Sequence, residues 1–198
     1  MVDTIIIGGA PCAGKSTLAS ALADRLGVKC FVLDELRETF QKDMVAEKEH
    51  YPWMYSSHDI SAEDFWRTRW PEDLVQMEIE QAREYWPILK KRIETEWAGI
   101  FEGVSVLPEL LWRDYGKNIR ALFLIDPDRR RVQNTIQTRG LWGDANSYAD
   151  WIKPLELEWV MLHNEWFRQQ AKKFPYPLIE VQDRPDTLAQ AEDLLGLA

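Results

Sequence analysis

The stretch Gly9-Ala10-Pro11-Cys12-Ala13-Gly14-Lys15-Ser16 decides how this chain of 198 residues is interpreted. It matches the phosphate-binding pattern G-x-x-x-x-G-K-[ST]. A short β-branched run from Thr4 to Ile7 precedes it, and the residues from Ser16 to Leu26 have the apolar spacing of a helix packed on a sheet. Because the motif stands between a strand and a helix, we expect it to form a loop that binds phosphate.

The positions of this loop have distinct expected roles in holding a nucleotide. The two glycines let the backbone wrap closely around a polyphosphate, and N–H groups at the helix N-terminus face the anion. Lys15 is expected to reach the β- and γ-phosphate oxygens, and the Ser16 hydroxyl is expected to ligate Mg²⁺. The predicted nucleotide-binding residues are therefore Gly9, Ala10, Pro11, Cys12, Ala13, Gly14, Lys15, Ser16 and Thr17.

Composition and charge narrow the class of protein. Of the 198 residues, 45% are hydrophobic and 29% are charged, which suits one soluble domain with a sizeable core. A net charge of −9 disfavours a nucleic-acid partner held by a broad basic surface. Cys12 and Cys30 show neither metal-ligand nor disulfide spacing, and no leader or membrane-length apolar run is visible. We therefore expect a cytoplasmic protein with free thiols, no nucleic-acid partner and no membrane contact.

Short apolar runs alternate with longer polar helical stretches, which is typical of a parallel sheet covered by helices. The stretch from residue 36 to residue 98 is too long for a simple crossover, so we expect a helical insertion that binds substrate over the site. Pro87 is expected to kink or break the helix within it. The predicted strands are Thr4 to Ile7, Cys30 to Leu33, Gly99 to Phe101 with Glu102 at its end, Arg120 to Ile125, and Pro177 to Val181.

Ligands of open α/β sheets bind at the carboxyl ends of the strands, and three side chains are candidates there. Asp34 follows the second strand and could orient or deprotonate a substrate hydroxyl, or could merely cap a helix. Glu102 ends the third strand and could hold Mg²⁺ or act in base chemistry. Arg139 lies in a polar segment, residues 129–150, that suits a mobile lid closing on phosphates, with a solvated helix face as the alternative for its arginine run.

The insertion is rich in aromatic residues, and the whole chain has 10 tryptophans. Aromatic side chains at helical spacing favour packing of helix on helix, although a ring-bearing acceptor could stack on them. His58 and Asp59 form a possible acid/base or metal pair, for which a surface role is favoured. Several arginines could bind an anionic acceptor or pair with nearby carboxylates, namely Arg37, Arg67, Arg69 and Arg83.

A family resemblance rests on the phosphate loop followed by Thr17, on Asp34-Glu35-Leu36-Arg37, on Phe101-Glu102-Gly103-Val104, and on the arginine-rich lid. Together these resemble the P-loop kinases of small molecules. Within that group the chain is similar to the nucleoside monophosphate kinase and shikimate kinase branch, and more closely to the 2-phosphoglycerate kinase, chloramphenicol phosphotransferase and zeta-toxin types.

The resemblance implies a P-loop NTPase fold, a three-layer α/β/α sandwich around a five-stranded parallel sheet of order 2-3-1-4-5. It also implies ATP with Mg²⁺ as the phosphoryl donor, Asp34 as the base and Arg139 as the lid arginine. Adenine is expected between Arg130 and the Asp183-Arg184-Pro185 turn. The second strand ends in Asp34-Glu35, whereas the shikimate kinase pattern is Asp-x-Asp, and a guanine motif of the Asn-Lys-x-Asp kind is absent, which favours ATP over GTP.

We therefore predict a single domain, residues 1–198, that moves the γ-phosphate of ATP to a hydroxyl or phosphate group of a small molecule. Asp34, Arg37 and Glu102 are the residues expected near that acceptor. One alternative is a nucleotide-dependent switch or regulatory ATPase, in which the aromatic insertion docks a protein partner. A second alternative is a toxin-like kinase that acts on a nucleotide sugar.

Overall fold

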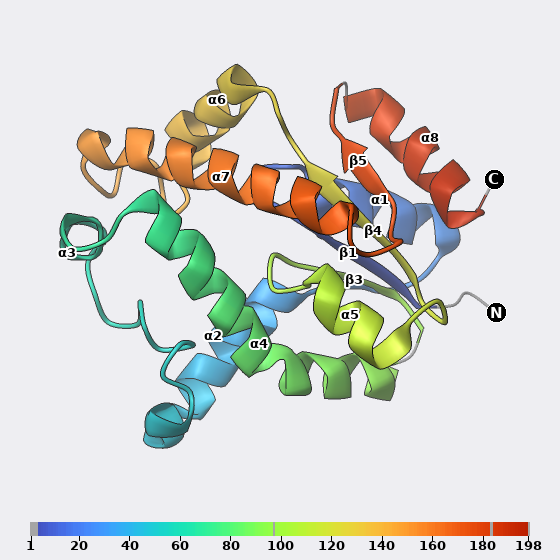
Figure 1. Ribbon diagram of the computed structural model, residues 1–198, viewed down its shortest axis with the longest axis horizontal. Coiled ribbons are helices and arrows are strands. Elements are labelled where there is room, and N and C mark those ends of the chain that lie inside the picture. Colours follow the sequence, from blue (N-terminus) through green and yellow to red (C-terminus); the bar gives the residue numbers. More distant parts are fainter. Residues whose placement is uncertain (1–3, 97, 183, 198) are drawn as a thin grey trace.

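A parallel sheet of five strands forms the centre of the computed structural model, in the order β2-β3-β1-β4-β5 (Figure 1). The structure describes residues 4–96, 98–182 and 184–197. The predicted strands are confirmed, with ends that differ by at most two residues, and so is the predicted strand order. The strands are β1 (Ile5–Gly9), β2 (Cys30–Val32), β3 (Ile100–Glu102), β4 (Arg120–Ile125) and β5 (Leu178–Glu180).

Helices cover both faces of the sheet. One face packs against α1 and α8 through side chains such as Leu22 and Leu195, and the other packs against α4, α5 and α7 through side chains such as Trp86 and Phe167. The fold is thus a three-layer α/β/α sandwich. The helices are α1 (Lys15–Leu26), α2 (Leu33–Asp43), α3 (Ala62–Arg67), α4 (Pro71–Glu96), α5 (Pro108–Tyr115), α6 (Arg129–Arg139), α7 (Lys153–Ala171) and α8 (Arg184–Leu195), with short 3₁₀ helices η1 (Val45–His50) and η2 (Asp150–Ile152).

The central strand β1 explains why the phosphate loop is held firmly. Ile5, Ile6 and Ile7 are each 0% exposed, because a strand in the middle of a parallel sheet is covered on both faces. The chain leaves this strand at Gly9, and Ala10 donates its backbone N–H to the Leu124 carbonyl at 3.0 Å. The loop therefore starts from a buried, hydrogen-bonded anchor.

The long helix α4 continues through Pro87, so the prediction of a break is wrong and the alternative prediction of a kink holds. Figure 1 shows its two halves running in different directions. Proline lacks the backbone N–H and its ring crowds the carbonyl four residues earlier, which bends a helix. Trp86 and Leu89 on either side of it are buried in the core, and this packing holds both halves. Among the described residues, no helix combines the length and apolar character needed to span a bilayer.

Replacing Gly9 with alanine is expected to lower the free energy of unfolding by about 3 kcal/mol or more. Gly9 has a φ of +129°, and a Cβ atom there would lie 2.0 Å from the Leu124 carbonyl oxygen. Because that oxygen belongs to the neighbouring strand, it cannot move without distorting the sheet. Urea denaturation of the purified variant measures the loss.

Gly27→Ala is the matched control for this experiment. Gly27 ends α1 with a φ of +65°, and nothing lies within 4 Å of its would-be Cβ. It therefore isolates the conformational cost of a positive φ, about 1 kcal/mol. A Gly9→Ala variant as stable as Gly27→Ala would contradict the close approach of β1 and β4 at this point.

Candidate active site

The loop between β1 and α1 surrounds a buried ammonium group. Cys12 and Gly14 adopt positive φ values of 63° and 87°, and α1 begins directly afterwards at Lys15. The Lys15 side chain is 7% exposed, and one of its three N–H groups donates to the Ala10 carbonyl at 2.8 Å. Burial lowers the pKa of Lys15, while the carboxylates of Asp34 and Glu102 act in the opposite direction. The loop thus combines helix N–H groups with a buried amine that lies in the field of two carboxylates.

Glu102, at the end of β3, faces the first turn of α1. Its side chain is 1% exposed and shares a hydrogen bond with the Ser16 hydroxyl. Burial raises the pKa of Glu102, and its Oε1 atom is buried without a hydrogen-bond partner in the described structure. A hydroxyl and an orphaned carboxylate oxygen are the hard ligands that Mg²⁺ prefers.

A magnesium ion would therefore fit beside Ser16 and Glu102. Within the described ranges, no group of three or more His, Cys, Asp and Glu side chains is placed to hold a metal by itself. In phosphoryl-transfer sites, Mg²⁺ is usually bound by one or two protein ligands together with the nucleotide phosphates.

Asp34 lies in the first turn of α2, directly after β2. The N-cap of that helix is Val32, and no side chain caps it, so the interpretation of Asp34 as a helix cap is wrong. Its Oδ1 atom is instead buried without a hydrogen-bond partner in the part of the chain that is described. Gly103, after β3, allows its backbone to lie close to the Asp34 side chain, since a Cβ atom at Gly103 would lie 3.3 Å from Oδ1 of Asp34.

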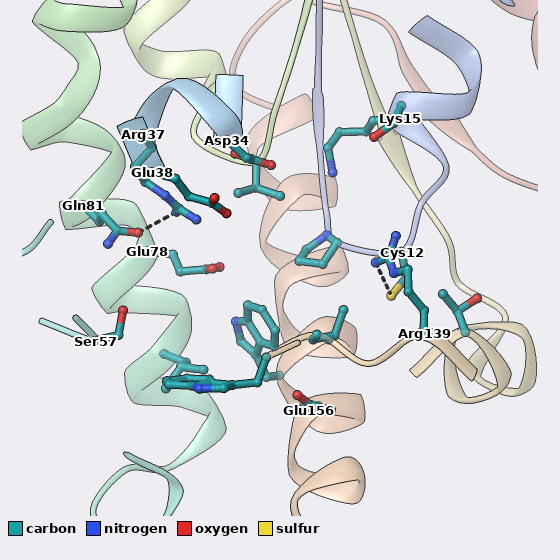
Figure 2. A pocket seen from close by; sticks show the side chains of 18 of the residues that line it. Cys12, Lys15, Asp34, Arg37, Glu38, Ser57, Glu78, Gln81, Arg139 and Glu156 are labelled. Carbon is teal, nitrogen blue, oxygen red and sulfur yellow. Dashed lines mark hydrogen bonds between the residues drawn. The ribbon is translucent and has the colours of Figure 1, made fainter. Parts of the chain in front are cut away.

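A cavity of about 750 Å³ joins these groups. Figure 2 shows Lys15 and Asp34 facing the cavity from α1 and α2, with Arg139 beside Cys12 and with Glu78 and Gln81 on α4. The α6 residues along it include Asn134, Thr135 and Thr138. Its wall also contains aromatic and apolar side chains from α3, α4, α7 and the loop after α6, namely Phe65, Trp66, Leu74, Met77, Leu141, Trp142 and Trp159.

Arg139 approaches the phosphate loop from the end of α6. Its Nη2 atom lies 3.9 Å from the sulfur of Cys12. Burial raises the pKa of the Cys12 thiol, and Arg139 and Lys15 partly offset that effect. The two positive groups thus stand on opposite sides of the loop, where a polyphosphate would carry its charge.

Of the four arginines that the sequence offers for an acceptor, only Arg37 lines the cavity. It donates from Nη1 to Gln81 at 2.9 Å, and its Nε atom is buried without a partner in the described structure. Arg67 pairs with Asp64, and Arg83 pairs with Glu80 and Glu109. Arg69 lies over the Phe65 ring at 4.4 Å. Arg67 and Arg83 thus follow the alternative of pairing with carboxylates, Arg69 contacts an aromatic ring instead, and the His58–Asp59 pair is on the surface.

Of the residues expected around adenine, the side chain of Arg130 alone can be described. Arg130 is exposed, and its backbone N–H is capped by Asp128. Its neighbour Arg131 binds the Asp126 carboxylate at 2.6 Å and the carbonyl groups of Val181 and Gln182, so it ties α6 to the end of β5. Asp183 and the Arg184 and Pro185 side chains lie outside the described residues.

Several residues of the cavity wall were not predicted from the sequence. Glu78 and Gln81 lie one turn apart on α4, on the face that also carries Leu74 and Met77. This helical spacing, with two polar residues inside an apolar stripe, was the signal that could have indicated them. No comparable sequence pattern indicated Trp142 in the lid loop or Glu156 on α7.

Glu156 is a buried carboxyl that holds this lid loop. Its side chain accepts a hydrogen bond from the Tyr148 hydroxyl at 2.8 Å and one from the Trp142 backbone N–H. The residue is 1% exposed, and burial raises the pKa of Glu156 to about 7. The folded protein therefore binds this proton more tightly than the unfolded chain does.

Glu156→Gln is expected to remove a pH dependence of stability. In the native protein this group's contribution is fully present below its ordinary pKa of 4.5 and is lost as the pH rises to about 7. The rise in the pKa of Glu156 corresponds to at most about 3 kcal/mol of the free energy of unfolding. Urea unfolding between about pH 5 and about pH 8 should show the difference between native and variant falling with pH and then levelling off above about pH 7.

The exposed Glu72→Gln in α4 is the control, and its difference from the native protein should stay constant over the same range. A Glu156→Gln difference that is equally flat would show that this carboxyl is not buried in the folded state.

Comparisons with known proteins agree with this fold. A family model described as an AAA domain matches residues 4–90, which include the phosphate loop and Asp34. A search of curated proteins found no match. Solved structures with the same fold include shikimate kinase from Acinetobacter baumannii in complex with shikimate, which is 15% identical with a TM-score of 0.57 and covers 100% of this chain and 93% of its own.

Two further structures resemble the chain along nearly its whole length. TT1252 from Thermus thermophilus is 18% identical with a TM-score of 0.53, over 97% of this chain and 95% of that chain. Deoxyadenosine kinase from M. mycoides with bound dATP is 16% identical with a TM-score of 0.51, over 98% of this chain and 99% of that chain. At these identities the similarity shows the fold, which is that of the P-loop kinases.

Proposed function

We propose that this protein is an ATP-dependent kinase that transfers the γ-phosphoryl group of ATP to a hydroxyl or phosphate group of a small molecule. The observation that carries the proposal is the shared cavity, which both Lys15 of the phosphate loop and the orphaned Asp34 carboxylate line. The fold of shikimate kinase and deoxyadenosine kinase supports it, as does the AAA domain match. Within the small-molecule kinases, the 2-phosphoglycerate kinase, chloramphenicol phosphotransferase and zeta-toxin types remain our proposed relatives.

The donor would bind at residues 9–17, with its β- and γ-phosphates between the loop N–H groups and Lys15. Ser16 and Glu102 would hold Mg²⁺, which supplies neutralisation of the charge on those phosphates when bound. Arg139 would add positive charge from the lid, residues 129–150, and exclude water when the lid closes.

The acceptor would enter between the phosphate loop and the insertion, residues 36–98. Asp34 would accept the proton of the acceptor hydroxyl. At the same time the oxygen of that hydroxyl would bond to the γ-phosphorus, and the bond from the γ-phosphorus to the β,γ-bridging oxygen would break, which leaves ADP. Arg37 would position the acceptor from the next turn of α2. Glu102 shares a hydrogen bond with Ser16, the other proposed metal ligand, which supports its role in holding Mg²⁺. Asp34 is then the proposed base.

The burial of most aromatic residues in the insertion favours a kinase over a protein-docking switch. Phe65, Trp66, Tyr85 and Trp86 are at most 4% exposed and form core and cavity wall, whereas Trp53 and Trp70 are 44% and 71% exposed. A switch that only hydrolyses ATP would also have no use for a large cavity beside Asp34.

Rates of ADP formation separate these possibilities. The protein is given ATP and Mg²⁺ alone, then with a pooled metabolite extract, then with the protein fraction of a lysate. A kinase forms ADP slowly in water and much faster with the small molecules. Stimulation by the protein fraction alone would support the switch and contradict the proposal.

A further inference from the structure

The acceptor side of the cavity carries more negative than positive charge. We define this acceptor side as the lining residues of α2, α3, α4, α7 and the lid loop, apart from the phosphate loop and α6. Among the described residues its charged members are Asp34, Glu38 and Glu78 against a single guanidinium, Arg37. Glu156, with a pKa of about 7, adds a partial negative charge. The other lining cations, Lys15 and Arg139, stand beside the phosphate loop.

Arg37 is poorly placed to bind an acceptor that carries several negative charges. Asp34 and Glu38 flank it on α2, and Figure 2 shows Glu38 and Glu78 near it at the cavity. One of its N–H groups is also used by Gln81. Recognition of a phosphate group usually needs more than one free cation in a favourable field. A phosphorylated or polycarboxylic acceptor would therefore meet net repulsion here.

Glu78 is a carboxylate held in place for a ligand. Its Oε2 atom is buried and lies 3.1 Å from Nδ1 of His163, a side chain that is 1% exposed. His163 is packed against the rings of Trp159, Trp166 and Phe167. The His163 contact is an ion pair only when that imidazole is protonated, and neither Lys nor Arg forms an ion pair with Glu78 in the described ranges. Beside a neutral His163, a carboxylate in this wall is costly unless another positive group pairs with it.

The aromatic part of the wall suits the same kind of ligand. Trp66, Trp142 and Trp159 line the cavity, and tryptophan is the side chain that binds cations best through its ring face. The indole N–H groups of Trp66 and Trp159 are buried without partners in the described structure. They could donate to ether, carbonyl or hydroxyl oxygens of the acceptor.

We propose that the phosphoryl acceptor is an alcohol that carries a protonated primary or secondary amine. The amine pairs with Glu78 among the tryptophans, and the hydroxyl reaches Asp34 and receives the γ-phosphoryl group as described above. This inference rests on the proposed kinase function and names the chemical class of its acceptor.

The charge of the acceptor is tested on a pooled metabolite extract without knowledge of its identity. The extract is divided at neutral pH into fractions retained by a cation exchanger, retained by an anion exchanger, and retained by neither. Each fraction is incubated with enzyme, Mg²⁺ and ATP labelled in the γ-phosphoryl group. We expect labelled product from the cationic fraction, and we expect it to disappear after amine-selective acetylation with sulfo-N-hydroxysuccinimidyl acetate.

Product from the anionic or neutral fraction, or product that survives acetylation, would overturn the amine assignment while leaving the kinase function intact. The absence of labelled product from every fraction and from the whole extract would instead overturn the kinase function.

Glu78→Gln then tests the pairing residue with the product-forming fraction. We expect KM for the acceptor to rise about 10- to 100-fold with little change in kcat, because the lost interaction is one of binding. Glu80→Gln on the same helix, where Glu80 pairs with Arg83 outside the cavity, should leave both constants unchanged. An unchanged KM in Glu78→Gln would contradict the role of this carboxylate.

Discussion

Replacing Lys15 with alanine is expected to reduce ATP-dependent turnover by at least about 1000-fold. The Lys15 ammonium is buried at the phosphate loop, and no other lysine among the described residues lines the cavity. Its charge opposes the negative charge that develops on the transferring phosphoryl group, and water cannot replace it in a buried position. Steady-state ADP formation at saturating ATP and Mg²⁺ measures the effect.

The variant should still fold, which makes the loss of activity interpretable. Burial lowers the pKa of Lys15, so the ammonium gains no stability from its position, and alanine removes a desolvated charge. Lys29→Ala, at an exposed site before β2, is the control and should keep native activity. Turnover by Lys15→Ala within about tenfold of the native rate would contradict the placement of the γ-phosphate at this loop.

Asp34→Asn is expected to bind ATP normally and to lose phosphoryl transfer by about 100- to 10,000-fold. The amide has the size of the carboxylate and lies outside the phosphate loop, so the nucleotide site should stay intact. It cannot accept the proton of the acceptor hydroxyl, however, and that proton must leave as the new bond to phosphorus forms. Titration calorimetry with ATP and rapid-quench measurement of labelled product separate binding from transfer.

Glu35→Gln is the matched control, since Glu35 is the next residue of α2 and its side chain is exposed. It should transfer phosphoryl groups at the native rate. Native transfer by Asp34→Asn would show that another group, or the substrate itself, takes the proton.

Local sequence signals were sufficient to predict the sheet and the phosphate loop. The β-branched run before Gly9 and the apolar helix after Gly14 are short-range patterns, so they do not depend on distant contacts. The strands and the loop therefore required no tertiary information. The roles of Arg67 and Arg83 were left open, although Asp64 and Glu80 lie one helical turn from them in the sequence.

The residues of the acceptor side could be identified only from the three-dimensional fold. Glu78 meets His163 only because α4 lies along α7, although 85 positions separate them in the chain. Arg131, and not its neighbours, reaches Asp126 and the end of β5, because the direction of a side chain depends on the rotation of α6 about its own axis. The roles of Trp142 and Glu156 likewise follow from the docking of the lid loop on α7, which no local pattern specifies.

The most direct test of the proposed function is the fate of the γ-phosphoryl group. The protein is incubated with Mg²⁺, ATP carrying heavy oxygen in that group, and a pooled metabolite extract, and the products are identified by mass spectrometry. A small molecule that gains one labelled phosphoryl group with the native protein, and not with Asp34→Asn, is the predicted result. Label found only in inorganic phosphate, at equal rates with and without extract, would contradict a kinase and indicate an ATPase.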